Sequence, residues 1–183
     1  MCMFGLPLNF WLIQLIGIAA LALTGIAYQG KTRHAILSGQ LIGALFFGVH
    51  FLLLGAYTGA LMNLIIALRN FVFEEKDHRS WANHAVWPPL FMALAAAVLA
   101  LTWQGPISLL PVIATIIATY ALWSGKPAFI RELLLFATLL WMPYTLAVGS
   151  YAGTITQIVM VISLLFGIAR RDHHWIRSKR WHL

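Results

Sequence analysis

The chain carries the same residue pattern twice, about 95 positions apart. In the first copy, a Tyr-Gln-Gly-Lys corner at 28–31 precedes an apolar run and a Gly-Ala-Tyr-Thr-Gly segment at 55–59. In the second, a Trp-Ser-Gly-Lys corner at 123–126 precedes an apolar run and a Gly-Ser-Tyr-Ala-Gly segment at 149–153. The corner glycine lies 25 residues before the segment in one copy and 24 in the other. Such regular repetition predicts a duplicated structural unit.

The composition places this unit in lipid. Hydrophobic residues make up 61% of the chain and charged residues only 9%, whereas roughly a quarter of a soluble domain is charged. Seven apolar runs approach or reach the length of about 17–25 residues that a membrane-spanning helix needs. These runs are 9–28, 35–54, 57–73, 85–103, 107–123, 129–148 and 152–169. The sequence therefore predicts an all-α, polytopic membrane protein with seven transmembrane helices.

Charge predicts the orientation of these helices. All 12 lysine and arginine residues lie near or after the ends of the first, third, fifth and seventh runs, and the hairpins around 55, 105 and 149 hold none. Under the positive-inside rule, the N-terminus lies outside and the C-terminus in the cytoplasm. The five acidic residues fall on the same side as the basic ones, so no carboxylate is expected in mid-membrane. Because the charges do not form one continuous face, nucleic acid is not an expected partner.

The two copies share one orientation, and this fixes how they are joined. Three helices placed directly after three others would point the opposite way, because three is an odd number. The run 85–103 supplies the extra crossing, which predicts a 3+1+3 arrangement of two parallel triple-helix-bundle repeats. The predicted units are 1–80 for the first repeat, 81–105 for the linker helix, 106–172 for the second repeat and 173–183 for a basic cytoplasmic tail.

Two stretches resemble a known family. The run from His50 to Tyr57, with Arg69 twelve residues beyond the tyrosine, is similar to the YgjV family of bacterial inner-membrane proteins. So is the Leu-Leu-Pro-Val-Ile run at 109–113, with Ala-Leu at 121–122. The resemblance covers most of the chain and implies a bacterial inner-membrane location. The 3+1+3 layout is more distantly similar to SWEET sugar transporters, PnuC-type transporters and the KDEL receptor.

Polar residues also occupy equivalent positions in the two copies of the repeat. Asn63 and Gln157 each lie six residues beyond the tyrosine that opens their helix, or about 9 Å into the membrane at 1.5 Å per residue. An uncharged amide offers donors and acceptors to a polar solute, and the resemblance to SWEETs implies sugar-binding amides at these positions. Interhelical hydrogen bonding is the structural alternative. We predict substrate binding by both.

Other side chains are expected to shape the same site. His50 and Tyr144 are equivalent in the two copies, and Trp141 lies one turn before Tyr144. A histidine within a membrane helix indicates either a functional group or a neutral partner for a neighbouring helix. Trp141 is suited to stacking on a substrate ring. We predict that all three help to bind the substrate.

Three residues are predicted to act in gating. The resemblance to SWEETs implies a hinge proline at Pro111, whose counterpart in the first copy is Ile16. Pro143, within the sixth run, is expected to bend its helix. Arg69 lies near the cytoplasmic end of the third run and is expected to snorkel to the lipid headgroups. Alternatively, it forms an intracellular gate or attracts an anionic substrate.

The sequence favours a transporter or facilitator of a small neutral or weakly polar solute, such as a sugar, nucleoside or vitamin-like metabolite, by alternating access. The alternatives are a receptor-like or scaffold membrane protein of the same fold, and a proton-linked exporter that uses His50. No sequence motif for an enzyme, a cofactor or a metal site is present. The expected partners are the lipid bilayer and the solute, and a homo-oligomer is compatible with the sequence.

Overall fold

The structure is a computed structural model that describes residues 2–3, 6–28, 33–124 and 127–179, with side chains described within 9–26, 38–124 and 129–169. Seven α-helices and one 3-10 turn account for most of it. They are α1 (Leu8–Tyr28), α2 (Arg33–Leu53), α3 (Tyr57–Glu75), α4 (Trp87–Leu101), η1 (Pro106–Ser108), α5 (Leu109–Ser124), α6 (Pro127–Ala147) and α7 (Tyr151–Lys179). The two Gly-Lys corners, and the side chains of the basic tail, lie outside the described residues.

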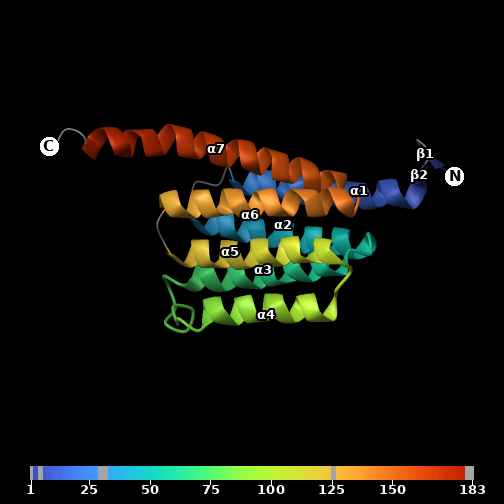
Figure 1. Ribbon diagram of the computed structural model, residues 1–183, viewed down its shortest axis with the longest axis horizontal. Helices are drawn as coiled ribbons and strands as arrows, with labels where there is room; N and C mark the ends of the chain where they lie inside the picture. The colour runs from blue at the N-terminus through green and yellow to red at the C-terminus, as the bar shows by residue number, and fades with distance from the viewer. Residues whose placement is uncertain (1, 4–5, 29–32, 125–126, 180–183) are drawn as a thin grey trace.

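Two short antiparallel strands of two residues each, β1 (Cys2–Met3) and β2 (Leu6–Pro7), precede the helices. No pattern in the sequence predicts these strands. The helices themselves lie almost parallel to one long axis, with α4 along one side of the bundle and α7 along the other (Figure 1). The fold class is therefore the expected polytopic helical one.

The helix boundaries follow local chemistry. α2 and α6 end two residues before Gly55 and Gly149, which both have a φ of +72°. Only glycine adopts this left-handed conformation without strain. In each corner the glycine N–H and the following N–H donate to carbonyls in the last turn: Gly55 to Leu52 at 3.0 Å and Ala56 to Phe51 at 2.9 Å. This is the Schellman motif, which satisfies carbonyls that a helix end otherwise leaves without partners.

Helix neighbours are arranged in a ring. α1 packs on α2, α2 on α3, α3 on α5, α5 on α6, α6 on α7, and α7 on α1, while α4 packs outside the ring against α3 and α5. We call α1–α3 the first triplet and α5–α7 the second. The first helix of each triplet thus lies beside the third helix of the other.

The two ends of the bundle differ in their connections. One end, which we call the hairpin end, holds the Gly55 corner and the Gly105 turn, because Gln104 Nε2 donates to the Gly55 carbonyl at 2.8 Å. The Gly149 corner lies at the same end, because His50, near the end of α2, contacts Ser150. At the other, the basic end, Lys76 Nζ donates to the Trp123 carbonyl at 3.2 Å and lies over the Trp123 ring. α1 and α5 both begin at the hairpin end, so they run in the same direction (Figure 1).

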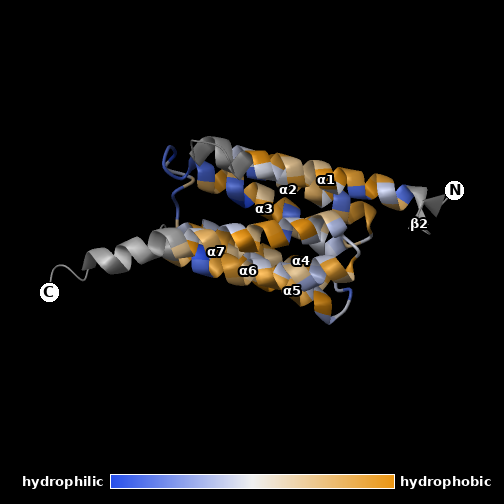
Figure 2. Cartoon of the chain, turned by 90° about the horizontal axis from the view of Figure 1, so that it is seen from above, coloured by the Kyte–Doolittle hydropathy of each residue, from blue (hydrophilic) through white to orange (hydrophobic). Residues whose placement is uncertain are grey.

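Most of the helical residues are hydrophobic, and the connection that follows α3 is hydrophilic (Figure 2). Large hydrophobic side chains on the outside of the bundle, such as Leu68 and Ile26, are half or more exposed. Within the described residues, four segments are long and apolar enough to cross a membrane: Asn9–Ile26, Pro106–Ser124, Phe129–Ala147 and Tyr151–Ala169. Ser38–Leu53 and Trp87–Leu101 are shorter apolar helices. Lipid is the solvent that such a surface requires.

Candidate functional site

A cavity of about 590 Å³ lies inside the ring of six helices. All six ring helices contribute to its lining, and α4 contributes none of the lining residues that the structure describes. Its polar lining residues are Thr24, Gln40, Asn63, Arg69, Asn70, Thr115, Arg131, Thr138, Thr156, Gln157 and Ser163. A cavity of this size is in the range of small-molecule sites, which are typically about 300–1,000 Å³.

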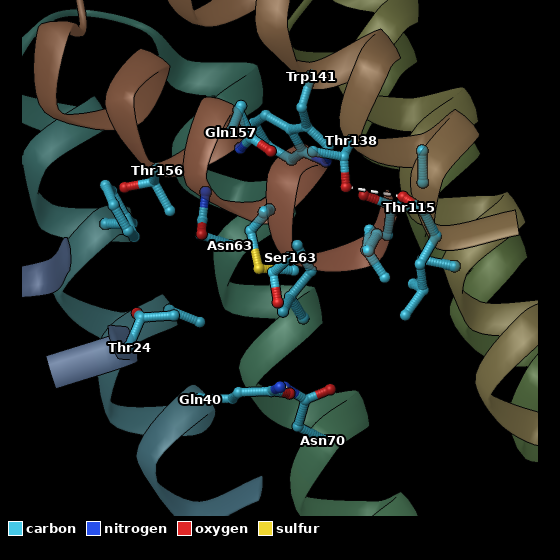
Figure 3. A pocket seen from close by; sticks show the side chains of 18 of the residues that line it. Thr24, Gln40, Asn63, Asn70, Thr115, Thr138, Trp141, Thr156, Gln157 and Ser163 are labelled. Carbon is cyan, nitrogen blue, oxygen red and sulfur yellow. Dashed lines mark hydrogen bonds between the residues drawn. The ribbon is translucent and has the colours of Figure 1, made fainter. Parts of the chain in front are cut away.

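The amides of Asn63 and Gln157 both face this cavity (Figure 3). Asn63, on α3, is buried and donates from Nδ2 to the Gly59 carbonyl at 2.9 Å. Gln157, on α7, is half-buried. The two predicted amides therefore line one cavity from two different triplets, and Asn63 is oriented by a bond to its own helix.

Aromatic side chains lie toward the hairpin end of the cavity. Phe47 and Phe51 of α2 and Trp141 of α6 are buried lining residues. The Phe51 and Trp141 ring centroids are 6.0 Å apart with an interplanar angle of 35°. Figure 3 shows Trp141 on one side of the amides and Gln40 and Asn70 on the other. The cavity thus has an aromatic end and a polar end.

His50 and Tyr144 do not line the cavity, although both are fully or almost fully buried. They instead connect the triplets at the hairpin end. His50 Nε2 is 2.8 Å from Ser150 Oγ, at the start of α7. Tyr144 Oη accepts a hydrogen bond of 2.8 Å from the backbone N–H of Gly59, in the first turn of α3. Each second helix therefore contacts the start of the other triplet's third helix.

The partners of His50 define its tautomer. Its Nδ1 is 2.9 Å from the Ile13 carbonyl, and a carbonyl can only accept, so Nδ1 carries the proton. In the neutral ring Nε2 then accepts from the Ser150 hydroxyl. Ser150 Oγ in turn accepts from the Gly153 N–H at 3.1 Å. The histidine, the serine and the first turn of α7 thus form one hydrogen-bonded chain.

Gln14 adds a further connection at the same end. Its Nε2 donates to the Gly149 carbonyl at 2.9 Å, and its Oε1 accepts from the Ala152 N–H at 3.4 Å. α1 is thereby attached to the corner between α6 and α7. Together with His50 and Tyr144, this side chain closes the hairpin end with hydrogen bonds between triplets.

Arg69 does not snorkel to the membrane surface, so that expectation is wrong. Its side chain is only 4% exposed and lines the cavity. The guanidinium donates to Asn70 Oδ1 at 3.0 Å from Nη2, and to Thr119 Oγ1 at 3.3 Å from Nη1. Polar acceptors within the protein take the place of lipid headgroups because α5 lies directly beside α3.

The two prolines occupy different kinds of position. Pro111 lies in the first turn of α5, directly after η1, and accepts at its carbonyl from Thr115 Oγ1 at 2.7 Å. A proline in a first turn removes an N–H that has no helical partner. Pro143 lies within α6. Their roles in gating stay predictions.

Sequence reasoning missed several lining residues, of which Arg131 is the most consequential. It was counted among the cytoplasmic flanking charges, yet its side chain reaches the cavity from α6. Thr138 and Ser163 were also missed. The available signal was spacing: Thr138 and Arg131 are seven residues apart, so they share one face of α6.

Apolar helices around an internal polar cavity, with hydrophobic side chains turned outward, define a multi-pass helical membrane protein. A family model described as a bacterial inner membrane protein, Imp-YgjV, matches residues 11–174. The chain therefore belongs to the YgjV family of bacterial inner membrane proteins. The inner membrane protein YgjV of Escherichia coli strain K12 is 26% identical over 149 residues, which cover 81% of this chain and 78% of that protein. No solved structure matches the chain.

Proposed function

We propose that the protein is a transporter that moves a small polar solute across the bacterial inner membrane by alternating access. The supporting observation is the cavity of about 590 Å³, which both triplets line and which carries amides, hydroxyls and aromatic rings. In the proposed arrangement, α1–α3 and α5–α7 are parallel triple-helix repeats and α4 is the linker. The matching corners at Gly55 and Gly149 and the common direction of α1 and α5 support this.

The proposed orientation puts the hairpin end outside and the basic end in the cytoplasm, in keeping with the positive-inside rule. The hydrogen bonds of His50, Tyr144 and Gln14 then close the outer side. Lining residues extend from Phe51 toward Arg69 and Arg131, near the basic end. The described conformation therefore corresponds to a state closed to the outside, and opening requires these inter-triplet bonds to break.

His50 is assigned a connecting role in this proposal. Both of its ring nitrogens are engaged by Ile13 and Ser150, and it does not line the cavity. A proton-linked exporter would need this histidine to release its partners in each cycle. Solute flux that varies less than twofold between pH 5 and 8 would contradict that alternative, because a proton-linked cycle depends on the proton concentration on both sides of the membrane.

Reconstitution in liposomes tests the proposal. Purified protein should equilibrate at least one member of a labelled panel of sugars, nucleosides, amino acids and organic acids across the membrane. Gln157→Ala should slow this flux at least tenfold, because it removes a cavity amide that holds no structural bond among those described for the chain. Leu68→Ala is the matched control, since this side chain on α3 is half exposed on the outer surface.

The outcomes discriminate between the classes of function. Flux that is lost in Gln157→Ala and kept in Leu68→Ala supports transport through the cavity. Saturable binding of a panel member without any flux would identify a receptor-like protein instead. Absence of both would contradict a solute site in this cavity.

A further inference from the structure

Aromatic and amide side chains lie at one depth in the cavity. In the first triplet, Phe47 on α2 lies eight residues before the corner glycine and Asn63 on α3 lies eight residues after it. In the second triplet, Trp141 on α6 and Gln157 on α7 have the same spacing from their corner. At 1.5 Å per residue, all four lie about 12 Å from the corners. Because all four also line the cavity, each triplet presents one ring and one amide at this depth.

Several hydrogen-bonding groups at this depth have no partner among the residues that the structure describes. Asn63 Nδ2 donates to the Gly59 carbonyl at 2.9 Å, which leaves Asn63 Oδ1 as an unused acceptor. Trp141 is 92% buried, being only 8% exposed, and its Nε1–H is an unused donor. The Gln157 amide offers both a donor and an acceptor. Burying such groups without partners costs free energy, so they indicate a ligand that both donates and accepts.

The hydroxyl groups of the lining are bonded within their own helices. Each of four lining threonines donates from Oγ1 to the carbonyl four residues earlier, at 2.7–2.8 Å: Thr24, Thr115, Thr138 and Thr156. A hydroxyl has one proton to donate, so these four groups have no donor left for a ligand. A sugar has hydroxyls on every side and would meet few donors on this lining. The lining therefore favours a solute whose polar atoms are confined to one edge.

From these observations we propose that the transported solute carries a neutral planar ring with a cyclic amide, as in uracil. The ring N–H donates to Asn63 Oδ1, and the ring carbonyl accepts from Trp141 Nε1–H. The Gln157 amide bonds a further donor or acceptor of the same edge. The faces of the ring pack on Phe47 and Phe51, because planar rings attract one another at offset centroid separations of about 4.5–7 Å. This inference rests on the proposed transport function and narrows its solute to one chemical class.

The absence of charge on the ring follows from the residues at this depth. Phe47, Asn63, Trp141 and Gln157 are all uncharged. A charged ring buried among them would leave water without a counter-charge. An uncharged amide edge loses only hydrogen bonds to water, and the amide and indole groups replace these.

The two bonds to the amide edge come from different triplets. Asn63 belongs to α3 of the first triplet and Trp141 to α6 of the second. In the same conformation, His50 and Tyr144 join the triplets at the hairpin end. Separation of the triplets there would move the acceptor away from the donor. The ring is therefore recognised best in the conformation that is closed at the hairpin end.

Matched pyrimidine probes test each part of the inference. Uracil should bind the purified protein in detergent at least tenfold more tightly than 1,3-dimethyluracil, which keeps the ring and both carbonyls but has no amide N–H. It should also bind at least tenfold more tightly than 5,6-dihydrouracil, which keeps the amides but loses the planar ring. A site that hydrogen-bonds a ligand group rejects analogues without that group. Equilibrium dialysis with labelled probes measures the affinities.

Three results would overturn the inference. Equal binding of uracil and 1,3-dimethyluracil would contradict recognition of the amide edge. Equal binding of uracil and 5,6-dihydrouracil would contradict packing of a planar ring on the aromatic side chains. Glucose that binds as tightly as uracil, or uracil that does not bind saturably at all, would contradict the proposed class of solute.

Variants locate the ring in the cavity. Asn63→Leu removes the proposed acceptor, so the preference for uracil over 1,3-dimethyluracil should fall at least fivefold. Trp141→Phe removes the proposed donor and keeps an aromatic ring. It should weaken binding of both probes alike, at least fivefold, because both have the carbonyl. Trp103→Phe is the matched control, since Trp103 is half exposed and does not line this cavity.

The two variants differ in their readout, which separates recognition from a structural role. A loss of stability alone would not change the ratio of the two affinities in Asn63→Leu. Should Asn63→Leu not fold, Trp141→Phe carries the test. Uracil binding that is unchanged in the folded variants would place the ring elsewhere and overturn the inference.

Flux measurements distinguish failure of this inference from failure of the proposed function. Uracil that binds with the stated preferences but does not cross liposome membranes would leave the ring site standing and contradict transport. Other solutes that cross while uracil neither binds nor crosses would leave transport standing and contradict the ring site. Uracil that binds and crosses, with loss of both in Trp141→Phe, supports the two together.

Discussion

The two triplets form the same corner before their third helices, but they stabilise the following helix with different residues. Gly55 and Gly149 have the same φ of +72°. In the second triplet, Ser150 precedes α7, and its Oγ accepts from the Gly153 N–H at 3.1 Å. In the first, Ala56 precedes α3 and has no side-chain cap. The equivalent N–H, that of Gly59, donates to Tyr144 of the other triplet instead.

Because of this difference, the first triplet depends on the second for the cap of α3. The first N–H groups of a helix have no helical acceptor and cost free energy if they are buried without one. The second triplet supplies the acceptor within its own sequence, whereas the first takes it from Tyr144. Separation of the triplets at the hairpin end therefore leaves α3 without a cap but not α7.

The two corners also differ in the side chains that hold them at the hairpin end. His50, the counterpart of Tyr144, binds Ser150, which is already the cap of α7. Two glutamines bind the corner carbonyls, Gln14 that of Gly149 and Gln104 that of Gly55, at 2.9 and 2.8 Å. The two corners thus have equivalent surroundings built from residues at different positions of the sequence.

The largest effect is expected at the closest approach between the triplets. A Cβ added at Gly59 would lie 2.7 Å from Tyr144 Oη and 2.8 Å from its Cε1. Gly59→Ala should displace the ring and break its bond to the Gly59 N–H, at a cost of about 3 kcal/mol. Reversible unfolding in mixed micelles of detergent and SDS measures this.

Gly25→Ala is the matched control for this substitution. Gly25 also lies in a ring helix, and nothing lies within 4 Å of an added Cβ there. It should be neutral or slightly stabilising, because alanine favours helix more than glycine does. Equal losses of stability in both variants would show that contact with Tyr144 is not what requires glycine at position 59.

The next largest effect is expected when Tyr144 can no longer cap α3 of the other triplet. Tyr144→Phe removes the acceptor of the Gly59 N–H and should cost about 2 kcal/mol. Ala56→Ser would give α3 a cap of its own, like that of α7, typically worth about 1 kcal/mol. The cost of Tyr144→Phe should therefore fall by at least half in the Ala56→Ser background. Costs that simply add in the double variant would contradict shared capping.

Most of the fold could be predicted from sequence because lipid leaves a chain few options. Helices were expected over 57–73 and 129–148, and the structure has them at Tyr57–Glu75 and Pro127–Ala147. In a membrane every backbone polar group must be bonded internally, so apolar length and glycine breaks set the boundaries. The pair of strands at the N-terminus escaped prediction because two residues per strand leave no periodic pattern.

The sequence predicted how deep in the membrane the site residues lie, but not which way each side chain points from its helix. Residue counting for Asn63 and Gln157, and repeat equivalence for Trp141, predicted three residues that do line the cavity. Repeat equivalence also predicted His50 as a site residue, yet the neighbouring Phe51 lines the cavity while His50 faces α1 and α7. Successive helix residues point about 100° apart, and the rotation of a helix depends on packing. Arg131 was missed for a related reason, because a long side chain need not stay at the depth of its Cα.

The smallest loss of stability is expected from substitutions at the left-handed corner glycines, which the two triplets share. Gly55→Ala and Gly149→Ala each place a side chain in a left-handed conformation, which costs about 1 kcal/mol. Nothing lies within 4 Å of an added Cβ at Gly55, and only Phe10 Cε2 lies near one at Gly149, at 3.9 Å. Both losses should therefore agree within about 0.5 kcal/mol and add in the double variant, as expected for separate sites. Clearly unequal losses would show that the corners are alike in shape but not in energy, because backbone strain alone predicts the same value for both.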